Sequence, residues 1–155
     1  MKNKAISLPH LICLLSSLIC TLVLSAQNCN VRITRPAEGS NVAGTALISG
    51  TATLPANSHL WILAHQVGIN GYWPQGNGQA QVNQNTWDVL VYFGTPGNFG
   101  TFEVLAVVVD DQTHRNLQSW VQTAPNTTPP YQPIALPTVI DGCTIARLRV
   151  EKTNN

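Results

Sequence analysis

The sequence predicts an all-β chain folded as an antiparallel β-sandwich of about seven strands, with one short helix and a long proline-rich connection before the last strand. Short segments in which apolar and polar residues alternate recur along the chain. Alternation with a period of two is typical of a strand that buries one face. Turn signals rich in Pro, Gly and Asn separate these segments, for example at residues 36–39, 76–78 and 95–98.

Most of the expected strands alternate between apolar and polar residues, but one is apolar almost throughout. Residues 59–65 are almost continuously apolar, which is expected for a strand buried on both faces. Trp61 on this segment and Trp87 on an alternating one are interpreted as core residues. Residues 79–83 are a weak, polar candidate. The expected strands are residues 31–34, 46–54, 59–65, 79–83, 87–93, 102–109 and 146–151.

A single helix is expected over residues 112–122, where Leu117, Trp120 and Val121 share one helical face. Asp110 or Asp111 is expected to cap its N-terminus. The five prolines that follow, at positions 125, 129, 130, 133 and 137, exclude a central strand because proline lacks a ladder donor. We therefore expect an extended surface connection, and connections of this length are usually functional or mobile.

Residues 1–26 have the order of a secretory signal peptide: a basic head with Lys2 and Lys4, an apolar run, and a small-residue exit at Ala26. Cleavage after Ala26 leaves one domain, residues 27–155, with no membrane span. The alternative is a retained membrane anchor, although the apolar run is short for a span of about 20 residues. The predicted location is therefore secreted, either extracellular or periplasmic.

Two cysteines, Cys29 and Cys143, remain after this cleavage, because Cys13 and Cys20 belong to the signal segment. An even pair in an oxidising compartment predicts a disulfide, here closing a loop of 114 residues. Two free thiols are the alternative, since spacing alone does not show that the side chains meet.

Neutral polar side chains outnumber charged ones: 14 Asn and 10 Gln stand against 15 charged residues. Without Lys2 and Lys4, six basic and seven acidic residues remain, a formal charge of −1. Binding nucleic acid needs a dense Lys/Arg patch, so a nucleic-acid partner is excluded. With 44% hydrophobic residues the chain also lacks the composition of a disordered polyelectrolyte.

Residues 35–44 and 48–52 read R-P-A-E-G-S-N-V-A-G and I-S-G-T-A. This stretch resembles the opening of bacterial immunoglobulin-like (or fibronectin-III-like) modules, which often read P-x-x-G-x-x-V-x-G and then V-x-G-T-A. The resemblance covers residues 31–54 and implies an immunoglobulin-like sandwich that binds, spaces or displays rather than catalyses. The chain departs from it in the proline-rich connection and in a cysteine pair outside the inner strands.

The segment Y-W-P-Q-G-N-G, residues 72–78, is the candidate ligand site. Aromatic rings stack on the C–H faces of sugars, and side-chain amides supply hydrogen bonds to their hydroxyls. Tyr72, Trp73, Gln75 and Asn77 are therefore predicted to bind a neutral ligand such as a glycan. In the alternative interpretation, Trp73 folds back on the sandwich edge and the amides solvate a hairpin.

The side chains of His59, His65, Asp111 and His114 are candidate metal ligands, but their spacing matches no compact ligand motif. No metal, cofactor or catalytic residue is predicted. A nucleophile elbow is absent from the sequence, and Glu103 and Asp88, on expected strands, are interpreted as outward-facing.

The sequence thus predicts a secreted, non-catalytic extracellular binding module whose partner is a neutral glycan or another extracellular protein. The alternative is a structural or protein-partner interaction module of the cell surface, with residues 123–139 as its contact. A small hydrolase is the third hypothesis.

Overall fold

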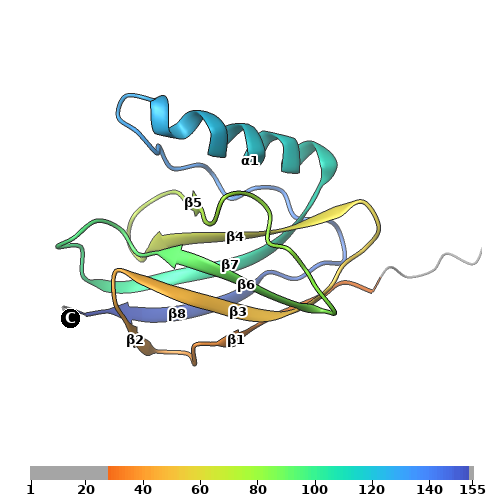
Figure 1. Cartoon of the computed structure of the whole chain (residues 1–155), viewed down its shortest axis with the longest axis horizontal. Coiled ribbons are helices and arrows are strands. Elements are labelled where there is room, and N and C mark those ends of the chain that lie inside the picture. The colour runs from red at the N-terminus through yellow and green to blue at the C-terminus, as the bar shows by residue number, and fades with distance from the viewer. Residues whose placement is uncertain (1–27, 154–155) are drawn as a thin grey trace, which may run out of the picture.

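The computed structural model describes residues 28–153, which form two β-sheets and one α-helix (Figure 1). The prediction of a mainly β chain is confirmed. The predicted signal peptide, residues 1–26, lies outside the described residues. Within residues 28–153, no helix is long and apolar enough to cross a membrane.

One sheet has three antiparallel strands in the order β1-β3-β6. These strands span Asn30–Arg35 (β1), Thr45–Thr53 (β3) and Thr86–Tyr92 (β6). All three are strands that the sequence predicts, because each alternates between buried and exposed residues.

The other sheet has five strands in the order β2-β8-β7-β4-β5. The short strand β2 runs parallel to β8, and the remaining pairs are antiparallel. The strands are β2 (Ser40–Val42), β8 (Ala146–Lys152), β7 (Gly100–Asp110), β4 (Ser58–Gln66) and β5 (Trp73–Pro74).

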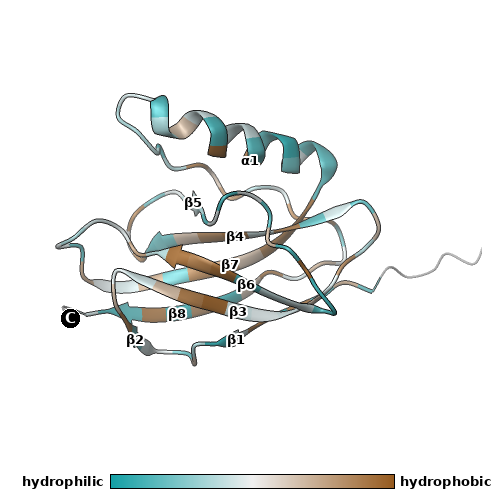
Figure 2. Cartoon of the chain, viewed as in Figure 1, coloured by the Kyte–Doolittle hydropathy of each residue, from teal (hydrophilic) through white to brown (hydrophobic). Residues whose placement is uncertain are grey.

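The central strands of the five-stranded sheet, β4 and β7, are buried on both faces, because the three-stranded sheet covers one face and the helix covers part of the other (Figure 1). In β4, Leu60 and Ile62 point between the sheets, whereas Trp61 and Leu63 point toward the helix. The predicted burial of residues 59–65 on both faces is confirmed for Leu60 to Ala64. Figure 2 shows this arrangement as brown strands beneath a helix that is mostly teal.

Helix α1 (Asp111–Thr123) begins where the sequence places its cap. The side chain of Asp110 accepts a hydrogen bond of 2.7 Å from the backbone N–H of Thr113. Leu117 is buried against the five-stranded sheet, and Val121 packs beside it. A 3-10 turn (Ala124–Asn126) follows, and with it begins a mostly exposed segment, residues 124–134, which we call the proline arm; Ala124 is its one buried residue.

Residues 79–83 do not form the predicted strand. Ala80 makes one bridge to Leu60, and Asn83 bridges to Thr86 across a tight turn. Gln84 and Asn85 occupy that turn with φ of 48° and 66°, which an extended strand does not allow. Strands β2 and β5 are not predicted from the sequence, since three and two residues are too few to show a period.

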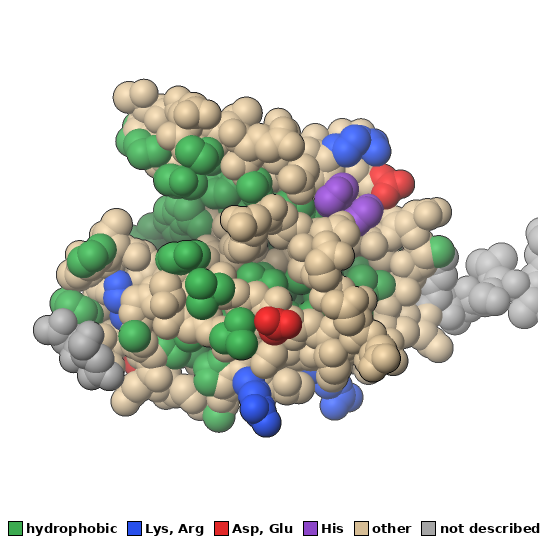
Figure 3. Space-filling view, in the orientation of Figure 1, with side chains coloured by type: hydrophobic (Ala, Val, Ile, Leu, Met, Phe, Trp, Pro, Cys, Tyr) green, Lys and Arg blue, Asp and Glu red, His purple; other side chains and the backbone are tan. Residues whose placement is uncertain are grey.

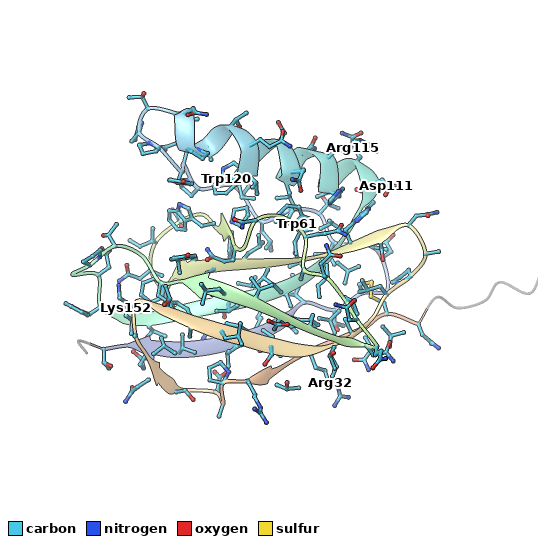
Figure 4. The ribbon with its side chains drawn as sticks, viewed as in Figure 1. Arg32, Trp61, Asp111, Arg115, Trp120 and Lys152 are labelled. Atoms are coloured by element: carbon cyan, nitrogen blue, oxygen red, sulfur yellow. A yellow bond between two sulfur atoms is a disulfide. The ribbon has the colours of Figure 1, made fainter. Side chains whose placement is uncertain are left out.

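The predicted disulfide between Cys29 and Cys143 is confirmed, and Figure 4 draws it as a yellow bond. The two Cα atoms lie 5.1 Å apart, within the usual range of about 4.4–6.8 Å. Cys29 precedes β1 and Cys143 precedes β8, so the bond joins segments that lead into different sheets.

Candidate functional site

A groove of about 1030 Å³ lies between the C-terminal half of α1, the proline arm and one edge of the sandwich. Figure 3 shows the hollow below the helical layer, with hydrophobic side chains along it. Its walls come from five parts of the chain: residues 64–69, 73–77, 90–98, Phe102 and residues 120–131. Pockets that hold small ligands typically have volumes of about 300–1,000 Å³, so this groove is at the large end of the range.

Aromatic side chains line the groove on several sides. Trp73 comes from β5, Tyr92 from β6, Trp120 from α1 and Tyr131 from the proline arm. Tyr92 is 60% exposed and Tyr131 is 53% exposed, so their rings are open to a ligand. Trp120 points from the helix toward β5 (Figure 4), and its ring centroid lies 6.3 Å from that of Tyr131.

The polar part of the lining consists of amides, the hydroxyl of Thr95 and one imidazole, that of His65. Amides come from Gln66, Gln75, Asn77 and Asn98, and no Asp, Glu, Lys or Arg side chain is among the described residues that line the groove. Gln66 and Asn98 are joined by a hydrogen bond of 3.4 Å, and Gln66 also donates to the carbonyl of Phe99. The described lining therefore offers hydrogen bonds and aromatic faces, and no carboxylate, ammonium or guanidinium group.

Three of the four residues predicted to bind a ligand line this groove: Trp73, Gln75 and Asn77. Tyr72 lies elsewhere, because adjacent residues in an extended segment point to opposite sides. Its ring packs 4.7 Å from the ring of His65, and its backbone pairs with Ile134. Tyr72 thus belongs to the helix-side core.

Gln75 is buried and its amide is already engaged. Its Oε1 accepts a hydrogen bond of 2.8 Å from the backbone N–H of Tyr92, and its Nε2 donates to the carbonyl of Trp73. The side chain thereby links β5, in one sheet, to β6, in the other. Gln75 positions two aromatic residues of the groove and leaves Asn77 as the exposed amide of the predicted loop.

Two indole N–H groups hold the proline arm in place. Trp73 Nε1 donates to the carbonyl of Tyr131 at 2.7 Å, and Trp120 Nε1 donates to the carbonyl of Gln132 at 2.9 Å. The aromatic loop and the proline-rich connection are separate candidates in the sequence. In the structure they meet and line one groove together.

Sequence reasoning misses Tyr92, Trp120 and Tyr131 as groove residues. Tyr92 carries a usable signal, since its alternation with buried Val91 places a large aromatic ring on the outer face. The pattern around Trp120 indicates only packing of the helix. For Tyr131 no periodic pattern exists, and its placement depends on the two indole contacts.

The acidic side chains lie outside the groove. Glu103 points away from the space between the sheets, as predicted, yet it is only 7% exposed because Arg147 and Arg149 cover it. Burial raises its pKa, but the hydrogen bond from His65 and the neighbouring guanidinium groups outweigh that effect and lower the pKa below its ordinary value. Glu103 is therefore held as an ion-paired carboxylate.

A histidine cluster ties the first turn of α1 to β4. His59 Nε2 lies 2.7 Å from Asp111 Oδ1, and the His114 ring stacks on the His59 ring at a centroid distance of 3.9 Å. Trp61 is fully buried, as predicted, but beneath the helix (Figure 4), where its Nε1 donates to His114 Nδ1 at 3.2 Å. Across residues 28–153, no group of three or more His, Cys, Asp or Glu side chains is arranged to hold a metal ion.

This cluster predicts an acid-sensitive contribution to stability. Burial is the largest of the effects that lower the pKa of His114 below its ordinary value of 6.5. The nearby His59 lowers this pKa further, and the opposing effect of Asp111 is smaller. The unfolded chain therefore takes up a proton on this imidazole at a higher pH than the folded chain does. The free energy of unfolding is expected to fall as the pH drops below about 6.5.

Urea titrations between about pH 7.5 and about pH 5.5 test this expectation. In the His114→Asn variant, the amide oxygen replaces the acceptor for Trp61, and the slope over this window should flatten. Glu103 and Asp110 also have lowered pKa values, but they affect stability only at a lower pH, around 4. An unchanged slope in the variant would assign the pH dependence to other groups.

No family model matches this chain, and no curated protein matches it.

Proposed function

We propose that the protein is a secreted, non-catalytic binding module for a neutral glycan. One observation carries the proposal: the large groove combines four aromatic side chains with amides, and no Asp, Glu, Lys or Arg side chain is among the described residues of its lining. Aromatic rings stack on the apolar faces of sugar rings, and amides exchange hydrogen bonds with hydroxyl groups. A charged ligand would lose part of its hydration in this groove and meet no carboxylate, ammonium or guanidinium group in the described lining.

The strand order supports an immunoglobulin-like sandwich as the scaffold. In immunoglobulin domains, strands A, B and E share one sheet, while C, F and G share the other. Here β1, β3 and β6 form one sheet, and β4, β7 and β8 are neighbours in the other. Such domains present ligands with loops and edges, in line with a groove at a sandwich edge.

Two features support export. The signal-peptide pattern of residues 1–26 is one, and the disulfide is the other, because disulfides persist mainly in oxidising compartments. The module would then act outside the cell or in a periplasm.

A protein-partner module of the cell surface is the second candidate function. Residues 125–133 are all exposed, although the two indole hydrogen bonds fix part of this segment. An exposed and ordered proline-rich segment is a suitable contact for another extracellular protein. The hydrolase hypothesis is weaker, since no carboxylate is among the described residues that line the groove.

Exchange of two exposed groove aromatics tests the glycan proposal. Tyr92→Thr keeps a residue suited to a strand, and Tyr131→Asn keeps one suited to the φ of 53° found there. Each variant is expected to weaken binding to the glycans recognised by the wild type by about tenfold or more, as loss of one stacking contact implies. Glycan arrays followed by calorimetry provide the measurement.

Val67→Thr is the matched control, because Val67 is 47% exposed and does not line the groove. This variant should bind like the wild type. If the wild type bound no neutral glycan, the proposal would be wrong. If instead a protein were captured by the wild type and lost on deletion of residues 125–130, the partner-module function would replace it.

A further inference from the structure

Three exposed apolar side chains lie together on the outer face of the three-stranded sheet. Leu47 is 57% exposed, Leu90 is 45% exposed and Tyr92 is 60% exposed. We call these three residues the apolar strip. The strands β3 and β6 pair Leu47 with Leu90 and Thr45 with Tyr92, so the three side chains are neighbours on one face.

The rest of this face is polar. Outward positions further along β3 and β6 carry Ser49, Thr51 and Asp88, as expected for a solvated sheet face. Single exposed apolar residues are common, but an adjacent set in an otherwise polar row marks a contact surface. No described residue covers the strip.

The apolar strip is continuous with the groove. Leu90 and Tyr92 belong to both, and Leu47 lies on the strand beside them, outside the groove. A ligand confined to the groove would leave Leu47 exposed. A ligand that follows the apolar surface leaves the groove across β6.

We propose that the ligand is an extended neutral polysaccharide chain, whose interior runs through the groove and across β6 onto the apolar strip. This inference rests on the proposed function and specifies its ligand: a chain of several sugar units, rather than a free monosaccharide or a chain end. The groove, at about 1030 Å³, already has room for more than one sugar ring.

The backbone of β6 favours a glycan over an added peptide strand. The N–H of Tyr92 points away from β3, because it donates to Gln75, and the N–H of Thr86 donates to Asn83. Asp88 and Leu90, between these two positions, present both their backbone N–H and C=O groups at the open edge. So short an edge blocks the pairing of a strand or a second copy, yet it offers a donor and an acceptor to sugar hydroxyls.

Oligomers of graded length test the inference. Calorimetry would use linear glucose and N-acetylglucosamine oligomers, from the monosaccharide to the hexasaccharide, together with any neutral glycan found on the array. The affinity of the wild type is expected to rise with length until the strip is covered. In Leu47→Thr, binding of the longest oligomer should weaken by roughly tenfold while binding of the disaccharide is unchanged.

Each outcome separates this inference from the proposed function. If glycans bind with an affinity independent of length, or if Leu47→Thr behaves like the wild type at every length, the extended-chain inference is wrong and the groove proposal stands. If no glycan binds at any length, both are wrong. A dimer in sedimentation that Leu47→Thr abolishes would instead assign the strip to a second copy of the chain.

Discussion

Replacing Cys29 and Cys143 together with alanine is expected to lower the free energy of unfolding by about 4–5 kcal/mol. The disulfide closes a loop of 114 residues, which encloses nearly all of the described chain. In the chain-entropy model, such a cross-link restricts the unfolded state, and the restriction grows with loop length. Domains are stable by only about 5–15 kcal/mol in total, so the bond would account for a large share.

Urea unfolding of the exported protein, with and without a reducing agent, measures this effect. The reduced wild type and the double alanine variant should unfold at the same urea concentration, well below that of the oxidised wild type. Peptide mapping without reduction should recover the linked Cys29 and Cys143 peptides. A difference below about 1 kcal/mol would show that the bond restricts the unfolded chain far less than its loop length predicts.

The long strands can be predicted because their burial alternates. Residues 46–54 and 87–93 place apolar side chains on one face, and the corresponding β3 and β6 bury that face. In a strand that is buried on both faces, such as β4, alternation is lost and the sequence no longer shows which face of the sheet a side chain lies on. The sequence predicts Trp61 in the sandwich core, whereas the side chain lies under the helix, because α1 forms a third layer.

The candidate site can be predicted only in part. Trp73 and Asn77 lie in one short segment, and their residue types alone indicate a ligand. The part of the lining from α1 and the proline arm cannot be predicted, since Tyr131 meets Trp73 and Trp120 only after the helix has packed on the sheet. Contacts between segments so far apart depend on tertiary structure and leave no periodic trace in the sequence.

Gly50→Ala is expected to destabilise the domain by about 3 kcal/mol or more. Gly50 lies on β3 directly opposite Trp87 on β6, and it faces the buried core. A methyl group here would overlap the carbonyl oxygen of Arg32 on β1 and lie 2.5 Å from Cζ2 of the Trp87 indole. The Arg32 backbone can move aside only by separating β1 from β3, and the buried Trp87 ring can move only by opening the core.

Gly44→Ala is the matched control, because a methyl group at position 44 meets no atom within 4 Å. It should change the stability by less than about 0.5 kcal/mol.

Trp87→Phe provides a second test, since the smaller ring vacates part of the space that the added methyl group needs. Combined with Gly50→Ala it should recover part of the loss, and only part, because the Arg32 carbonyl stays in place. Equal melting temperatures for the Gly50→Ala and Gly44→Ala variants would contradict this prediction. They would show that β1 and the Trp87 ring can shift at little cost in stability.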